Sequence, residues 1–594
     1  MDHTVMYGLV AIPVIGVLAQ VIAYRFNLPA ILLLLLSGFV FGPVLSLIDP
    51  DIVFGDVFYP LVSLSVALIL FEGGLTLKIS DLTHTGKVVR NLISIGYLIT
   101  CLGCAFFSHV LLGVDVKLSL LLGAVLSVSG PTVITPLVNQ IQLKRSVSNV
   151  LRWEGITIDP LGATVGVIFV GVLLSEKASQ AFGMALIIVL KTIVSGLVLG
   201  GVGAIVIMTV FKNRWVRSYF HEALTFIIVL SSYLTADIIQ SESGLLAVTV
   251  MGIILANQKI VVIKHIVTFK EIVSVLLLSS LFVMLAARIE IGALMSMMTL
   301  NSFLFVMALI FIVRPISVFF STLGSSLPFV ERLFLACIYP RGIVAASIAS
   351  IFALKLEAAG MPMAEKIVPI TFFTIVVTVI FYAIIGKPLM SVLNLHQRQK
   401  GLILAGATKW SREFAVILGE LGIQSVLVDT NLENVLLAKE AQLYCVNGSV
   451  LSKTVMESLE EAGFGGLLAM TDSDETNLLS TIEYAEIFGG KNVMRLSPKN
   501  KKRDINERPG VGRILFGKGI SLASLELSLT AGANFYIKDI DEYFDLKEFE
   551  RKYPSAIFIA VLSPKKILSL FDDHSKIKME SGSRLVLFGN NIVG

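Results

Sequence analysis

Charged residues are scarce in this chain of 594 residues: Asp, Glu, Lys and Arg make up 15% of it, and hydrophobic residues make up 55%. Soluble domains average about 25% charged residues, so the composition excludes a wholly soluble protein. Cysteine is rare as well, and four cysteines in apolar surroundings do not make a disulfide framework. The sequence also lacks a basic patch interleaved with aromatic residues, so we expect no nucleic-acid partner.

Two of the cysteines, Cys101 and Cys104, have the spacing of a metal or redox motif. They lie in an apolar stretch with no His or acidic neighbour, so we interpret them as small hydrophobic side chains of a packed helix. Residues 1–24 lack a basic leader and a small-residue cleavage site. We therefore expect a retained first helix rather than a signal peptide.

Long apolar runs fill the first two thirds of the chain, and charges return from about residue 398. A run of about 18 or more apolar residues can cross a hydrocarbon core of roughly 30 Å. We predict a polytopic α-helical membrane domain at residues 1–395, followed by a soluble tail. The thirteen predicted spans lie at about 5–24, 28–48, 58–77, 90–112, 117–139, 149–174, 181–211, 219–239, 242–258, 271–288, 299–323, 331–354 and 366–390.

The loops between these spans alternate in charge. One set is basic, with Lys144 and Arg145 as an example, and the other contains acidic loops such as the one with Asp49 and Asp51. The basic loops are cytoplasmic by the positive-inside rule. With thirteen spans, this places the N-terminus outside and the tail in the cytoplasm of a cell (inner) membrane.

Two spans carry matching interruptions, Ser129-Gly130-Pro131-Thr132 in the fifth and Tyr339-Pro340-Arg341-Gly342 in the twelfth. Unwound backbone inside a membrane is tolerated only where it is buried in protein or faces water. A pair of broken helices in two halves of a chain is typical of inverted-repeat transporters with a site near the midplane. We therefore predict inverted repeats that contain broken helices.

The sixth span contains two carboxylates, Glu154 and Asp159. An ionised side chain at bilayer depth costs about 2.5–3.5 kcal/mol on the insertion scale. On a helix the two acids point about 140° apart, so they need different partners. Pro160 removes a helical hydrogen bond and biases Asp159 away from helical geometry. Asp159 beside a freed carbonyl is a candidate site for a proton or a monovalent cation.

Glu154 needs a cation of its own or must stay protonated, and it is a further candidate for ion or proton binding. The intramembrane cations that could pair with it are Arg314 and Arg341. The alternative is that both acids belong to structural ion pairs. Thr132 and Thr135 flank the first interruption and offer hydroxyl oxygens to an ion, although threonines also serve helix packing. Glu72 lies near the cytoplasmic end of the third span, either at a cavity mouth or reaching toward the interface.

In order and spacing, the motifs of residues 1–395 resemble those of NhaP-like monovalent cation:proton antiporters of the sodium/hydrogen exchanger superfamily. The matching pieces are Leu28-Pro29-Ala30, Gly38-x-x-x-Gly42-Pro43, Phe71-Glu72-Gly73-Gly74, the broken fifth helix, Glu154-x-x-x-x-Asp159, Ser243-Gly244-Leu245-Leu246-Ala247, Arg314-Pro315 and Arg341-Gly342.

The resemblance implies that Asp159 alternately binds cation and proton, while Glu154 pairs with an arginine of span eleven or twelve. It also implies a homodimer in which a core domain moves against a dimerisation domain. The sequence departs from the family pattern at Ile158, where an Asn is usual, and in the fifth-span interruption, which lacks the usual Asp. Asp159 is then the lone titrating ligand, which predicts electroneutral one-for-one exchange of Na⁺ or K⁺ for protons.

The tail opens with the pattern of a dinucleotide-binding βαβ unit. Residues 401–406 form an apolar strand, a helix runs to about residue 421, and a second strand ends at Asp429. In such units the phosphates lie at the helix N-terminus and the acid binds ribose hydroxyls. The glycine fingerprint keeps only Gly406, with Thr408 and Ser411 at the other two positions.

Residues 400–515 resemble an RCK-type (TrkA N-terminal) regulatory domain, and residues 519–594 its smaller C-terminal companion. The resemblance implies a cytoplasmic Rossmann-like domain that binds a regulatory nucleotide, either NAD(H) or an adenine nucleotide. The candidate contacts are Gly406, Thr408, Ser411, Arg412, Asp429 and Asn477. A purely structural dimerising module is the alternative. Transport itself should need no cofactor.

Two other functions compete with exchange. An RCK-gated potassium channel needs a carbonyl filter of the Thr-Val-Gly-Tyr-Gly type, and the chain contains no such segment. A membrane-anchored oxidoreductase needs a substrate site and hydride-transfer groups beside the tail, and none is visible. We therefore expect a transporter rather than an enzyme.

Overall fold

The computed structural model covers the chain in two compact units, Met1–His396 and Gln397–Gly594, which are described separately. The structure describes residues 3–590, leaving out 27, 29, 131–133, 135–142, 175–177, 259, 262–263, 340, 394, 396–400, 499–512, 517–518, 541–550, 552–555, 565–567 and 573–579.

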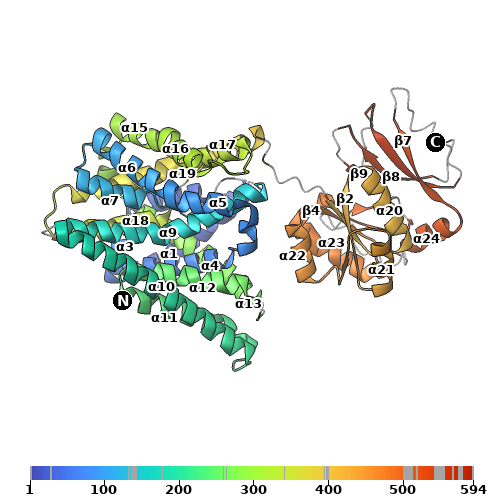
Figure 1. Cartoon of the computed structure of the whole chain (residues 1–594), viewed down its shortest axis with the longest axis horizontal. Helices are drawn as coiled ribbons and strands as arrows, with labels where there is room; N and C mark the ends of the chain where they lie inside the picture. Colours follow the sequence, from blue (N-terminus) through green and yellow to red (C-terminus); the bar gives the residue numbers. More distant parts are fainter. Residues whose placement is uncertain are drawn as a thin grey trace. The chain divides into compact units, whose positions relative to one another are not determined.

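The first unit is built of helices alone among its described residues (Figure 1). The helices are α1 (His3–Arg25), α2 (Ala30–Phe39), α3 (Pro50–Phe54), α4 (Phe58–Leu75), α5 (Leu82–Asn91), α6 (Tyr97–Leu112), α7 (Val116–Leu126), α9 (Arg145–Leu174), α10 (Ala178–Lys212), α11 (His221–Ile239), α12 (Ser243–Asn257), α13 (Lys264–Ala287), α14 (Ile291–Ser296), α15 (Leu300–Ala308), α16 (Arg314–Ser321), α17 (Phe329–Cys337), α18 (Ile343–Ala358) and α19 (Ile367–Val392).

The helices correspond to the predicted membrane spans. Within the described residues, eight helical segments are long and apolar enough to cross a membrane, and four shorter apolar helices match four further spans. The remaining predicted span, the twelfth, consists of two helices, α17 and α18, which the second interruption separates. A multi-pass membrane fold with broken helices is therefore confirmed.

Close helix crossings depend on glycine. A Cβ added to Gly74 of α4 would meet the backbone of α12 at Thr249 and Gly252, with the nearest oxygen 2.7 Å away. Small residues let membrane helices approach to backbone contact. The van der Waals packing gained in this way stabilises the helix pair, because lipid provides no hydrophobic effect between helices. The same device joins α10 to α12 at Gly200.

Three π-helical segments interrupt the α-helices, at Val40–Val44, Leu92–Gly96 and Leu309–Val313. Such π-turns often lie at functional sites because they shift the register of the side chains that follow. Two of them border the polar cluster described below: Gly96 ends the second segment, and Arg314 follows the third directly.

The tail begins with a six-stranded parallel sheet in the order β3-β2-β1-β4-β5-β6, the Rossmann order. Its elements are β1 (Gly401–Ala405), α20 (Lys409–Glu420), β2 (Gln424–Asp429), α21 (Leu432–Glu440), β3 (Cys445–Asn447), α22 (Lys453–Glu461), β4 (Phe464–Ala469), α23 (Asp474–Phe488), β5 (Val493–Arg495) and β6 (Arg513–Ile514). The predicted α/β tail is confirmed.

A second, antiparallel sheet follows in the order β7-β10-β8-β9. Its aromatic side chains pack on Trp410 of α20, whose ring centroid lies 5.2 Å from that of Phe535 and 5.9 Å from that of Phe588. The two sheets therefore share a core. The elements are α24 (Leu522–Thr530), β7 (Asn534–Asp539), β8 (Ile557–Leu562), β9 (Leu568–Leu570) and β10 (Arg584–Gly589).

Candidate cation site and candidate nucleotide site

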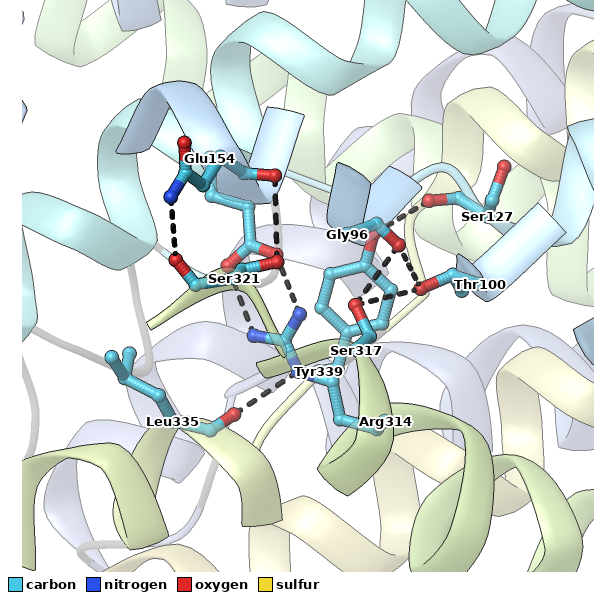
Figure 2. Close-up of polar contacts among 10 residues, drawn as sticks. Gly96, Thr100, Ser127, Glu154, Arg314, Ser317, Ser321, Leu335 and Tyr339 are labelled. Atoms are coloured by element: carbon cyan, nitrogen blue, oxygen red, sulfur yellow. Dashed lines mark hydrogen bonds and ion pairs between the residues drawn. The ribbon is translucent and has the colours of Figure 1, made fainter. Parts of the chain in front are cut away.

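A buried ion pair joins α9 to α16. Both terminal guanidinium nitrogens of Arg314 donate to the Glu154 carboxylate, Nη1 to Oε1 at 2.5 Å and Nη2 to Oε2 at 2.9 Å. The two side chains are 2% and 1% exposed. Arg314 Nε donates to the carbonyl of Leu335 at 3.0 Å (Figure 2). Bidentate geometry and this third bond satisfy charges that would otherwise be costly to bury.

Tyr339 lies next to this pair and connects it to the first interruption. Its ring stacks on the Arg314 guanidinium, 4.0 Å from the ring centroid, and also on Arg341 at 4.6 Å. Its hydroxyl donates to the Ser127 carbonyl, which lies just past the end of α7 (Figure 2). Tyr339 thereby satisfies a carbonyl that the broken helix leaves without a helical partner.

The two interrupted segments cross each other. Ser129 and Arg341 form an isolated antiparallel bridge. A Cβ on Gly342 would collide with the Cα of Gly130. The matched interruptions predicted from the sequence thus correspond to a physical crossing, with glycine on both sides because the backbones touch.

Arg341 does not pair with Glu154. It is 2% exposed, and its Nη2 contacts the Cys104 sulfur at 3.9 Å. Its Nε and Nη1 have no hydrogen-bond partner within the described part of the chain. Of the two arginines considered for Glu154, the structure uses Arg314.

Asp159 is fully buried on α9, and neither carboxylate oxygen has a hydrogen-bond partner among the residues that the structure describes. The expected departure from helical geometry is wrong, because α9 runs unbroken from Arg145 to Leu174 with Pro160 inside it. Close packing holds this helix: Gly162 approaches Val128 and Gly166 approaches Phe352. Neighbouring helices can support a membrane helix through a proline.

The other predicted ion-site residues are placed as follows. Thr132 and Thr135 lie outside the described residues. Ile158 is buried against Tyr97 and Cys101, so the position before Asp159 faces an apolar cluster. Glu72 is half-buried on α4, next to Gly73, where a Cβ would touch Ile156 of α9 at 3.2 Å.

The candidate nucleotide site lies where β1 and β4 end, between the two halves of the parallel sheet. Gly406 has φ +107°, and a Cβ there would lie 2.5 Å from the Met470 carbonyl oxygen, so only glycine fits. Asp429 at the end of β2 accepts from the Ala407 backbone N–H at 2.8 Å. It also accepts from the Asn434 side chain at 3.0 Å.

The other predicted contacts surround this loop. Thr408 and Ser411 are within hydrogen-bond distance of each other at 3.1 Å, and Arg412 donates to the Ala407 carbonyl at 2.7 Å. Asn477 holds the loop after β4 by accepting from the Thr471 backbone at 2.8 Å. Burial and the nearby Asp429 carboxylate raise the pKa of Cys445 on β3 to about 11.

A carboxylate of the chain itself occupies the N-terminus of α20. Glu526 of α24 accepts from the Trp410 backbone N–H at 2.8 Å. Helix N-termini carry free N–H groups and partial positive charge, and they bind phosphates or carboxylates. Side-chain carboxylates therefore already accept from two backbone donors here, the N–H groups of Ala407 and Trp410.

Comparison with known proteins identifies the membrane unit. The family model of the sodium/hydrogen exchanger transmembrane domain matches residues 10–392, and the TrkA-N domain model matches residues 402–515. The chain belongs to the sodium/hydrogen exchanger family.

Individual relatives agree with this assignment. The exchanger is 28% identical to Na⁺/H⁺ antiporter 1 of Methanocaldococcus jannaschii, over 62% of this chain and 91% of that protein. It is 24% identical to the K⁺/H⁺ antiporter NhaP of Alkalimonas amylolytica, over 64% of this chain and 65% of the relative. The solved structure of the sodium proton antiporter MjNhaP1 from M. jannaschii is 26% identical, covers 64% of this chain and 100% of that one, and has a TM-score of 0.56.

Sequence reasoning missed two residues of the exchanger's polar clusters. Tyr339 had a usable signal, because it directly precedes Pro340 and Arg341 in the second interruption. Glu526 had none, because its contact with Trp410 joins positions 116 residues apart. Only the packing of α24 on α20 brings them together.

Proposed function

We propose that the exchanger moves a monovalent cation, Na⁺ or K⁺, across the membrane in exchange for protons, with Asp159 as the carrier. The observation that carries this proposal is that Asp159 is fully buried and lacks a partner among the described residues, whereas Glu154 on the same helix has a complete set. A buried carboxylate must be neutralised by a proton or a cation. A single carboxylate that must bind either a proton or a cation is suited to exchanging one for the other.

Glu154 and Arg314 serve this carrier by fixing α9 against α16 and α17. Asp159 is on another face of α9, so it stays available while the ion pair keeps the helix in place. We further propose that backbone oxygens of the crossed interruptions, hydroxyls of Thr132 and Thr135, and water complete the cation's shell. Glu72 is assigned to the mouth of the access path.

The experiment is exchange in everted membrane vesicles loaded with a pH-sensitive dye. Asp159→Asn should abolish the dequenching caused by added Na⁺ or K⁺, because an amide cannot release a proton to accept a cation. Asp56→Asn is a matched control, since Asp56 is an exposed acid. Wild-type exchange by a folded Asp159→Asn protein would refute the assignment. A channel would conduct the cation without dequenching the dye.

We also propose that the tail regulates exchange by binding NAD(H) or an adenine nucleotide at Gly406, Thr408, Ser411, Arg412, Asp429 and Asn477. The Rossmann strand order and the glycine at the first loop support it. We propose that residues 400–515 and 519–594 form the two subdomains of the tail and that the protein is a homodimer. The tail would lie in the cytoplasm and the N-terminus outside the cell. Exchange measured with and without NAD⁺, NADH and ATP tests this regulation.

A further inference from the structure

The chain leaves the membrane unit at Leu395, which is anchored to the start of α9. Leu395 is 4% exposed and belongs to the membrane unit's hydrophobic core. Its carbonyl accepts from the Lys144 backbone N–H at 3.0 Å. Lys144 directly precedes α9, the helix that carries Glu154 and Asp159. The attachment point of the tail and the carboxylate-bearing helix are therefore bonded to each other.

Lys144 also holds a buried carboxylate on a third element. Its ammonium group pairs with Glu331 in the first turn of α17, and Ser146 Oγ donates to the same carboxylate at 2.8 Å. Glu331 is 2% exposed while Lys144 is 52% exposed. The ammonium can therefore return to water, but the carboxylate would then be buried without its cation, which is strongly unfavourable. A change at Lys144 therefore changes the free energy of holding Glu331, and with it α17, in this position.

The far end of α17 reaches the buried ion pair. The Leu335 carbonyl, four residues after Glu331, accepts from Arg314 Nε, and Arg314 binds Glu154. Figure 2 shows this end of the path. A displacement of α17 thus reaches Arg314, while a displacement of Lys144 reaches α9 directly.

We propose that the junction of Lys144, Glu331 and Leu395 transmits the state of the tail to the transport site. The proposal rests on the regulation by the tail proposed above and names the contacts that carry it. When the tail pulls on Leu395, the Lys144 contacts change, and α9 and α17 shift relative to each other. Glu154 is on α9, and its partner Arg314 is bonded to α17, so this shift strains the ion pair between them. The position of Asp159, which is also on α9, then changes relative to its neighbours. Glu331 is a positioning residue in this scheme.

A double-mutant cycle tests the junction without knowledge of the nucleotide. Four proteins are compared in proteoliposomes: the full chain, Glu331→Gln, the chain lacking residues 398–594, and the combination. The truncated chain is suitable for this comparison for two reasons. The membrane unit is compact by itself, and this chain covers 91% of the length of Na⁺/H⁺ antiporter 1 of M. jannaschii. The measurement is the cation concentration for half-maximal exchange at several pH values.

We expect truncation to shift that concentration at least threefold in the otherwise unchanged protein and less than 1.5-fold when Glu331 is Gln. Glu357→Gln, an exposed acid at the end of α18, should leave the full truncation effect. An equal truncation effect with and without Glu331 would overturn the junction while regulation by the tail stands. If truncation had no effect in any background, both the junction and regulation by the tail would be overturned. The proposal that Asp159 carries out exchange would not be affected.

A second variant covers the case in which Glu331→Gln fails to fold. Six Gly/Ser residues inserted after His396 leave every junction side chain in place but slacken the connection. This variant should behave as the truncated chain does, with the same shift in half-maximal cation concentration. A slackened chain that keeps the full-length value would contradict transmission through Leu395.

Discussion

The buried charged side chains of the membrane unit differ in how many hydrogen-bond and ion-pair partners they have. Glu154 and Arg314 satisfy each other through two bonds, and a backbone carbonyl satisfies the remaining nitrogen. Asp159 has no such partners in the described part of the chain. Burial of an unpaired charge is unfavourable. The Glu154–Arg314 pair therefore fits a structural role, and the lack of partners at Asp159 fits its proposed role in ion binding.

This division predicts a large loss of stability when the pair is broken. Glu154→Gln leaves the Arg314 guanidinium buried without its counter-charge, at a cost of about 3–5 kcal/mol. We expect a clearly lower midpoint of thermal unfolding in detergent, followed by tryptophan fluorescence.

The control is Asp51→Asn, which breaks the ion pair between Asp51 and Arg288. Asp51 is 55% exposed, and exposed pairs contribute about 0–1 kcal/mol, so the midpoint should barely move. Equal midpoints for the two variants would contradict the structural role of Glu154.

Between elements, the crossing of the two interrupted segments brings two backbones into direct contact in the membrane unit. The bridge between Ser129 and Arg341 and the hydroxyl bond of Tyr339 tie the end of α7 to the segment before α18. These contacts fix backbone carbonyls near α9, where Gly162 packs against Val128.

Gly342→Ala should therefore abolish exchange. Its Cβ would overlap the Cα of Gly130, and backbone cannot move aside as a flexible side chain can. We expect vesicle exchange to fall at least tenfold. Gly201→Ala in α10 is the matched control, since a Cβ there meets nothing within 4 Å. Normal exchange by Gly342→Ala would show that the crossing is not needed.

In the tail, the contact between α24 and α20 predicts competition with a nucleotide. Glu526→Gln removes a negative charge from the N-terminus of α20, where we propose that the phosphates bind. We expect NAD⁺ or ATP to bind the full-length variant at least fivefold more tightly in equilibrium dialysis. Glu483→Gln, an exposed acid on α23, should bind as the wild type does. Unchanged affinity in Glu526→Gln would place the phosphates elsewhere.

For the whole molecule, one titrating carrier predicts electroneutral exchange. As the proposed carrier, Asp159 would bind either one proton or one monovalent cation, so a cycle would move no net charge. The rate in proteoliposomes should not change when valinomycin and a K⁺ gradient impose a membrane potential, with Na⁺ as the exchanged ion. A rate that follows the potential would require a second titrating group.

The sequence predicted most of the fold because membrane spans and Rossmann strands are local patterns. Apolar runs marked the spans, and the glycine and proline residues at 130, 131, 340 and 342 marked the interruptions. The conformation around Asp159 was predicted wrongly, since the local effect of Pro160 was overcome by packing of α9 on its neighbours. The choice of Arg314 over Arg341 also depended on which helices meet.

The sequence by itself determined a membrane unit with two intramembrane acids and an α/β tail, because hydropathy and alternation are properties of short segments. Tertiary structure alone decided the pairing of Glu154 with Arg314, the occupation of the α20 N-terminus by Glu526, and the bond between Lys144 and Leu395. Each of these contacts joins residues more than 100 positions apart, and buried charges leave only a few stable arrangements once the helices are packed.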